Sequence, residues 1–171
     1  LLARAQLISP VFHSSAAGLP LSSFVNEKIF KLYFLDVGLA NAMARVNWET
    51  LATDAPENTF FERAGSSAEQ FIAQHLIDLS KSVSPLSEVY YWVRESKNSH
   101  AEVDFLIERE GRIVPIEVKA GKAGRMRSLA QLLSSRPIKS AIRFDLNPPS
   151  DMEFGSAQVR SLPLYAVERL G

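Results

Sequence analysis

Two acids and a lysine stand out in neighbouring apolar segments of the chain. Asp104 interrupts the apolar run at residues 101–107, and Glu117 and Lys119 alternate with apolar residues at residues 112–120. Carboxylates are hard oxygen ligands, the kind that Mg²⁺ selects. An ammonium group beside such an ion is suited to holding an attacking water or neutralising charge that develops on a phosphate. If the three side chains meet, the chemistry that suits them is phosphodiester hydrolysis.

The turn between the two segments decides whether these side chains meet. A two-residue hairpin turn at residues 110–111 sets Asp104 directly opposite Glu117, with Lys119 two residues further along the same face. Facing carboxylates repel, normally at a cost of up to ~1 kcal/mol, and a divalent cation removes that cost. The alternative, an amphipathic hairpin whose charged face is merely solvated, stays open on spacing alone. The other face is predicted to be apolar and buried, and it carries Val103, Phe105, Ile107, Val114, Ile116 and Val118.

The segments around this hairpin predict a sheet flanked by helices. Apolar residues recur at helical spacing before and after the hairpin, and aromatic and β-branched residues mark the strands. The order α-β-β-β-α-β places the chain in the α/β or α+β class. The expected elements are a helix at 65–82, strands at 88–93, 100–107 and 112–120, a helix at 124–136 with Leu129, Leu132 and Leu133 facing inward, a strand at 139–146, and a further strand or terminal helix at 159–170.

The first third of the chain is less regular. Residues 31–35 predict a strand, and Asp36 suits the N-cap of a helix at residues 37–46. The polar, proline-bearing residues 49–59 predict a linker. The expected division is an N-terminal connecting segment at residues 1–58 and a main domain at residues 59–171.

Composition narrows the classes of partner. The 171 residues are 46% hydrophobic, enough to bury the core of one domain with a small appendage. The formal net charge is +0, so a nucleic acid has to bind a local basic patch. The absence of cysteine excludes disulfides and thiolate metal sites and agrees with a cytoplasmic location. No apolar run reaches the ~18 residues of a membrane span, so no membrane partner is expected.

The pattern of Asp104, Glu117 and Lys119 resembles the D-(x)n-E-x-K signature of the PD-(D/E)xK, or restriction-endonuclease-like, nuclease superfamily. The core of that superfamily has the order α-β-β-β-α-β, so the resemblance implies a restriction-endonuclease-like core. It also implies that Asp104 and Glu117 bind Mg²⁺ and that Lys119 assists catalysis. In many members of the superfamily a glutamate on the first core helix joins the metal site, so the resemblance implies that Glu69 is a further metal ligand and catalytic residue. The proline of the family name is absent, because Val103 precedes Asp104.

A second resemblance covers nearly the whole chain. Its strings resemble the C-terminal domain of unknown function carried by many bacterial and archaeal AAA-type ATPases: KLYFLDVGLANAM, AEQFIAQHL, YYWVRE, AEVDFLI and IVPIEVKAG. This resemblance implies an ATPase part in the same polypeptide, before these residues. The chain contains no G-x-x-x-x-G-K-[ST], so it is not expected to hydrolyse ATP itself. Residues 1–13 are then expected to be the tail of a connecting helical or winged-helix segment.

A structural role competes with metal binding for Glu69. Ser66 and Glu69 have the spacing of a capping box, in which the glutamate bonds back to the start of its own helix. The two roles compete for the same carboxylate, and the sequence leaves both open.

A basic segment follows the acids. No acidic residue occurs between Lys119 and Arg143, and Lys122, Arg125 and Arg127 lie where the next helix is expected to begin. A helix N-terminus with nearby cations can form a phosphate-binding site, so these three residues are predicted to bind nucleic acid. The alternative is a solvated helix face.

Three functions remain open. The first is a Mg²⁺-dependent endonuclease or exonuclease that acts on DNA. The second is a non-catalytic nucleic-acid-binding or regulatory module. The third is an assembly domain that docks ATPase subunits to each other, as an oligomer, or to a partner protein. The intact set of Asp104, Glu117 and Lys119 favours the first.

Overall fold

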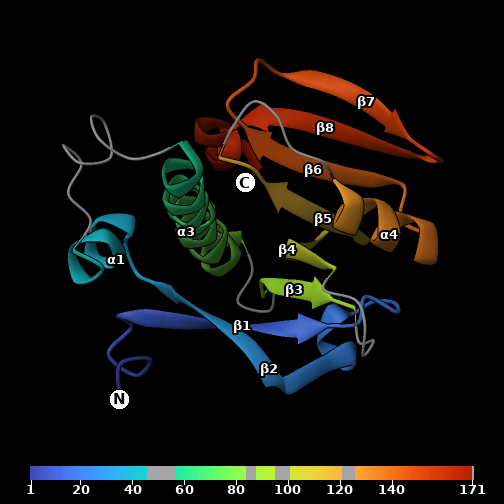
Figure 1. The fold of residues 1–171 in the computed structure, drawn as a ribbon. Coiled ribbons are helices and arrows are strands. Elements are labelled where there is room, and N and C mark those ends of the chain that lie inside the picture. Colours follow the sequence, from blue (N-terminus) through green and yellow to red (C-terminus); the bar gives the residue numbers. More distant parts are fainter. Residues whose placement is uncertain (46–56, 84–87, 95–100, 121–125, 171) are drawn as a thin grey trace.

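Eight strands form one mixed sheet with α-helices packed on both faces (Figure 1). The structure is a computed structural model that describes residues 1–45, 57–83, 88–94, 101–120 and 126–170. The strand order is β2-β1-β3-β4-β5-β6-β8-β7. The strands are β1 (Ile8–Ser14), β2 (Val25–Phe34), β3 (Tyr90–Val93), β4 (Glu102–Arg109), β5 (Arg112–Val118), β6 (Ser140–Asp145), β7 (Ser150–Phe154) and β8 (Ala157–Pro163). The helices are α1 (Val37–Met43), α3 (Glu57–Val83) and α4 (Arg127–Ser135), with the 3-10 helices η1 (Leu21–Phe24) and η2 (Leu164–Leu170).

The predicted order of elements is confirmed. From α3 onward the chain runs α3-β3-β4-β5-α4-β6, which is the α-β-β-β-α-β order of a mixed α/β sheet. Strands β3, β4 and β5 are antiparallel neighbours, and β5 runs parallel to β6. Both alternatives for residues 159–170 occur in succession, as the end of β8 and then η2. None of the described helices is both long and apolar enough to cross a membrane.

Each face of the sheet has its own hydrophobic core. One core combines Ile72 of α3 with Phe105 and Ile116 of the hairpin, all fully buried. The other combines Leu132 of α4 with Leu106. The leucines of α4 that the sequence places inward, Leu129, Leu132 and Leu133, are all buried. Because both faces of β4 and β5 are covered, a polar site on these strands has to lie at the strand ends.

The N-terminal residues correct the expectation of a helical tail. Residues 8–14 form β1, which pairs with β2 on one side and β3 on the other, and so belongs to the main sheet. Ile8, Val11 and Phe12 carry β-branched or aromatic side chains, which favour a strand. Residues 1–45 and the main domain therefore share one sheet.

The predictions for α1 and for the segment before α3 are confirmed only in part. Asp36 is the predicted N-cap of α1, and its Oδ1 accepts a hydrogen bond from the N–H of Leu39 at 3.0 Å. The predicted linker at residues 49–59 lies outside the described residues as far as residue 56. Its last residues begin α3 at Glu57, so the expected boundary after residue 58 falls inside that helix.

The β4–β5 hairpin has the predicted turn. Arg109 pairs with Arg112, which leaves a two-residue connection. Glu110 and Gly111 have φ angles of 51° and 68°. A type I′ turn requires positive φ at both positions. The turn sets the register only as far as Phe105 opposite Ile116, so Asp104 is not paired directly opposite Glu117 as predicted.

Replacing Gly111 with alanine is expected to lower the free energy of unfolding by about 1 kcal/mol, because a Cβ is strained at this positive φ. A Cβ at Gly111 meets no atom within 4 Å, so the loss comes from the backbone alone. The matched control is Gly65→Ala in α3, where a Cβ also meets nothing within 4 Å. That change is expected to raise the free energy of unfolding by about 1 kcal/mol, because alanine favours a helix more than glycine does. Urea unfolding measures the change in the free energy of unfolding for both variants. If Gly111→Ala were as stable as wild type, the type I′ turn would be contradicted.

One predicted face of β4 is wrong at Val103. Tyr90 of β3 lies opposite Leu106, but Trp92 lies opposite Val103, so two steps along β3 span three along β4. A bulge of this kind reverses the alternation of side chains beyond it. Val103 therefore joins the core under α4, whereas Phe105 stays in the core under α3.

Candidate active site

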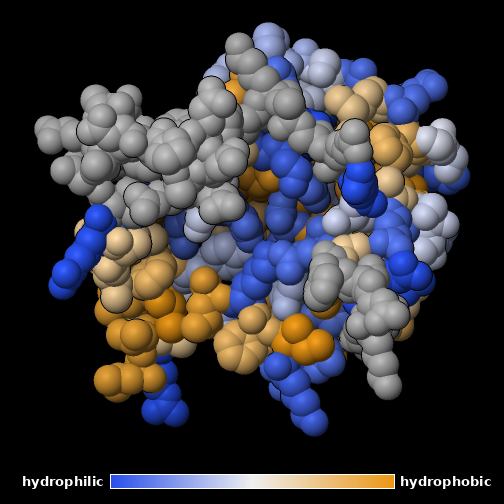
Figure 2. Space-filling view, in the orientation of Figure 1, coloured by the Kyte–Doolittle hydropathy of each residue, from blue (hydrophilic) through white to orange (hydrophobic). Residues whose placement is uncertain are grey.

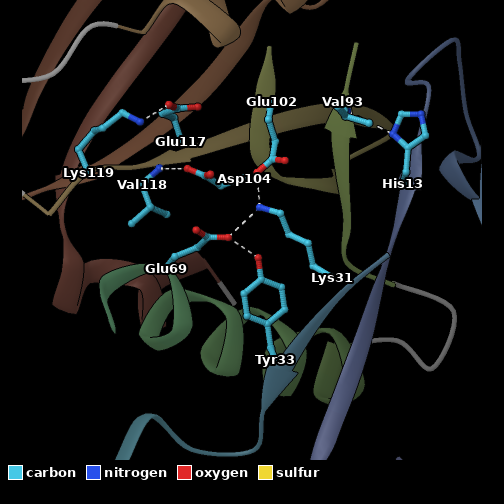
Figure 3. Close-up of polar contacts among 10 residues, drawn as sticks. All are labelled: His13, Lys31, Tyr33, Glu69, Val93, Glu102, Asp104, Glu117, Val118 and Lys119. Carbon is cyan, nitrogen blue, oxygen red and sulfur yellow. Dashed lines mark hydrogen bonds and ion pairs between the residues drawn. The ribbon is translucent and has the colours of Figure 1, made fainter. Parts of the chain in front are cut away.

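Asp104 lies where β4 and β5 separate. The regular pairing of the two strands ends at Phe105 opposite Ile116, and Asp104 falls within the bulge of β4. Its Oδ2 accepts a hydrogen bond from the N–H of Val118 at 2.7 Å (Figure 3). The bulge thus directs this carboxyl group toward β5 at the end of the paired region, an arrangement bulges often provide beside functional sites.

Glu117 is a buried carboxylate with one unpaired oxygen. It is 3% exposed, and its Oε1 forms an ion pair with Nζ of Lys119 at 2.5 Å. The other oxygen, Oε2, is buried and has no hydrogen-bond partner among the described residues. Burying a carboxylate oxygen without a donor or a cation is costly. A cation bound to this oxygen would therefore remove the cost of burying it unpaired.

Burial and mutual repulsion change the protonation of both acids. Burial first, and then the charges of Glu117 and Glu69, raise the pKa of Asp104 to about 8. Burial also raises the pKa of Glu117, although Lys119 and Arg143 oppose the rise. Without a cation, Asp104 therefore keeps its proton at neutral pH, and a second negative charge beside Glu117 is avoided.

Glu69 lies beside these acids but does not cap a helix. Helix α3 begins at Glu57, so Ser66 is in its interior and the capping-box prediction is wrong. Oε1 of Glu69 accepts a hydrogen bond from Nζ of Lys31 at 2.9 Å and a short one from the hydroxyl of Tyr33. These contacts direct the carboxylate toward the strands, so it can act on Asp104 and Glu117 through its charge.

Lys31 is a site residue that the sequence reasoning missed. Its ammonium group lies between Glu69 and Glu102, with an ion pair to each, and 5.3 Å from the ring centre of Tyr91. Burial alone would lower the pKa of Lys31, but the two carboxylates raise it above its usual value. Lys31 is therefore a permanent cation among the acids. The signal available in the sequence was the alternation of Lys31 and Tyr33, which puts both on one face of a strand.

The carboxylates converge from three elements. Figure 3 shows Glu69 of α3 and Glu102 of β4 directed toward Lys31, while beside them Asp104 of β4 points to the backbone of Val118 and Glu117 of β5 points to Lys119. Figure 2 shows hydrophilic side chains gathered in a hollow at the middle of the displayed face, where α3 meets the strands in Figure 1. The proximity of the predicted acids is thus a property of the fold and not only of the sequence pattern.

The predicted phosphate-binding cations are placed only in part. Lys122 and Arg125 lie outside the described residues. Arg127 is exposed and is the first residue of α4. Its side chain is open to solvent, as binding a phosphate requires.

The family model for DUF4143, described as a domain of unknown function, matches residues 64–159, more than half of the chain. The chain belongs to this family. Its predicted membership of an uncharacterised domain family is thereby confirmed, while no curated protein matches the chain. The DUF4143 match includes Glu69, Asp104, Glu117 and Lys119, whereas Lys31 precedes it.

The acids of the DUF4143 chain suit one divalent cation held by two side chains. In the described ranges, no group of three or more His, Asp or Glu side chains is arranged to hold a metal ion. Mg²⁺ usually keeps several waters and uses only one or two carboxylates. The unpaired Oε2 of Glu117 and the carboxyl group of Asp104 match that requirement. Glu69, whose Oε1 is engaged by Lys31 and Tyr33, stays a predicted third ligand.

Proposed function

We propose that this DUF4143 chain is a Mg²⁺-dependent nuclease domain that hydrolyses phosphodiester bonds of DNA. The observation that carries the proposal is the unpaired, buried oxygen of Glu117 close to Asp104, whose pKa is raised, at the point where their strands separate. The element order and the E-x-K spacing support a restriction-endonuclease-like, PD-(D/E)xK assignment. The resemblance to C-terminal domains of AAA-type ATPases supports a cytoplasmic role beside an ATPase part of the same polypeptide.

Each residue has a distinct task in this proposal. Asp104 and Glu117 hold the ion, with Glu69 as auxiliary ligand. Bound there, Mg²⁺ supplies a Lewis acid for the oxygens of the scissile phosphate. The side chain of Lys119 is 30% exposed, so its ammonium group reaches solvent from beside Glu117 and can position water or offset charge on the phosphate. The basic side chains Lys122, Arg125 and Arg127 bind neighbouring backbone phosphates.

A specific observation favours a second candidate function, a non-catalytic nucleic-acid-binding or regulatory module. Lys119 pairs with Glu117, and the single positive charge of Lys31 is shared between Glu69 and Glu102. These internal ion pairs offset much of the negative charge without a metal. A domain that retains the fold and basic surface but does not cleave would need such compensation.

Replacing Lys119 with alanine separates the two functions. The change is expected to lower Mg²⁺-dependent cleavage of DNA about a hundredfold, because one stabilising charge is lost from the transition state. The affinity for DNA is expected to stay unchanged, because Lys119 is proposed to act on charge that develops only in the transition state. Lys28→Ala, on the exposed surface of β2, is the control and is expected to cleave as wild type does.

The assay covers single-stranded, double-stranded and branched DNA with Mg²⁺ and with Mn²⁺. If wild-type protein cleaves none of them, the nuclease proposal is wrong. If it binds DNA under the same conditions without cleaving, the second candidate function is correct.

A further inference from the structure

A cavity of about 680 Å³ lies between β2, α1 and α3. Lys31 and Glu69 form part of its wall, so the cavity lies directly beside the carboxylates of the candidate active site. Its volume is within the range of pockets that enclose a ligand the size of a nucleotide.

Asn41 gives this cavity an unused hydrogen-bond donor. The residue lines the cavity and is only 7% exposed. Its Oδ1 accepts a hydrogen bond from the hydroxyl of Ser67 at 3.1 Å, whereas its Nδ2 has no partner among the described residues. Buried amide groups are nearly always hydrogen-bonded in native proteins, so an orphan donor in a cavity wall indicates a ligand with an acceptor.

The rest of the wall indicates which acceptor. Lys31 is already paired with Glu69 and Glu102, so Arg45 is the lining cation that remains for a ligand. The wall is therefore suited to a phosphate or another anionic acceptor. Leu32 and Phe34 add apolar surface, which suits a base or sugar better than a bare phosphate.

We propose that this cavity binds one nucleotide of an unpaired nucleic-acid strand, with the Asn41 amide and the Arg45 guanidinium group as polar contacts. The inference rests on the proposed nuclease function, because the carboxylates beside the cavity would act on the adjoining phosphate of the same strand. A duplex is too wide to enter a cavity of this volume, so the strand has to be single at this point.

Binding without metal tests the cavity separately from cleavage. The probe is a fluorescein-labelled single-stranded DNA hexamer, added to the full chain in EDTA and followed by fluorescence anisotropy. Asn41→Leu is expected to raise the dissociation constant about tenfold, as the loss of one buried polar contact implies. Ala44→Trp, which fills the cavity from its exposed wall, is expected to abolish binding. Asn26→Leu, near the start of β2 and outside the cavity, is expected to bind as wild type does.

Thermal unfolding distinguishes a ligand contact from a structural one. Asn41→Leu is expected to keep or raise Tm, because it removes an unsatisfied buried donor. A lower Tm with unchanged affinity would overturn the proposal, because Asn41 would then be structural.

The remaining outcomes separate this inference from the nuclease proposal. Wild-type affinity in both Asn41→Leu and Ala44→Trp would overturn the cavity site and leave the Lys119 experiment unaffected. Absence of hexamer binding by wild type would overturn it as well. Equal competition by free dAMP would assign the cavity to a mononucleotide instead of a strand and so overturn the proposal. Loss of binding in both variants, with no cleavage by wild type in Mn²⁺, would support the binding site and reject the nuclease.

Discussion

The variant Asp104→Asn is expected to lose metal-dependent cleavage altogether and, without metal, to be more stable than wild type at pH 8. The two effects have one cause. Asparagine keeps an oxygen that can accept the N–H of Val118, as Oδ2 of Asp104 does at 2.7 Å. It carries no charge, so it neither repels Glu117 nor binds a hard cation strongly.

The sign of the stability change follows from proton binding. The folded protein holds the proton of Asp104 up to a pKa of about 8, whereas the unfolded chain releases it near the ordinary value of 3.8. Between these values the folded state binds more protons, so stability is full below about pH 4 and falls as pH rises toward 8. One proton corresponds to a slope of up to about 1.4 kcal/mol per pH unit.

Urea unfolding in EDTA at pH 5 and pH 8 measures this difference. Wild type is expected to lose stability from pH 5 to pH 8, and Asp104→Asn is expected to lose less. At pH 8 the free energy of unfolding of the variant is then about 2 kcal/mol higher than that of wild type. Added Mn²⁺ should stabilise wild type, increasingly so as pH rises, because binding releases the proton. Asp151→Asn, on the exposed strand β7, controls for the chemistry of the substitution. A variant that loses stability at pH 8 would show that Asp104 has a structural role.

The hairpin shows what local sequence can specify. Strict alternation before and after Glu110 and Gly111 gave the register, and the turn type agreed with it. The two features belong to adjacent residues, so no distant contact was needed to choose between alternatives. The buried leucines of α4 were predictable for the same reason, because helical spacing alone places them on one face.

The bulge at Asp104 was not predictable in this way. Its position depends on how β3 pairs with β4, and the chain between Val93 and Glu102 is too long to set their register as a two-residue turn does. The Ser66 and Glu69 pattern failed for a related reason: a capping box has meaning only at a helix start, and α3 begins at Glu57. Lys31 lies 38 positions before Glu69, so only the folded sheet shows that they meet.

The variant Lys31→Met is expected to lose about 3 kcal/mol of stability at pH 8 in EDTA, at the lower end of the cost of breaking a buried ion pair. Lys31 and Glu69 have side chains only 22% and 27% exposed, so water replaces the lost charge poorly. Glu102 would lose the same partner. Methionine keeps the length and the apolar contacts of the stem, which isolates the ammonium group. Lys28→Met, on the same strand but exposed, is expected to change stability little.

Mn²⁺ tests whether Lys31 stands in for a metal ion. If its charge offsets the acids when metal is absent, Lys31→Met should bind Mn²⁺ more tightly and regain part of its stability on binding. Calorimetry with Mn²⁺ and urea unfolding with and without it measure both effects. If Lys31→Met loses stability but binds Mn²⁺ no more tightly than wild type, the role of Lys31 is only to form its ion pairs with Glu69 and Glu102.

The double variant Lys31→Met with Asp104→Asn decides between a local and a collective role. Lys31 lowers the pKa of Asp104 through its charge, although no direct ion pair joins them among the described contacts. If the acids act as one group, removing the charge of Asp104 should relieve part of the loss caused by Lys31→Met, and the two effects will not add. Strict additivity at pH 8 would mean that Lys31 and Asp104 act independently, and the role of Lys31 would then be limited to its own ion pairs.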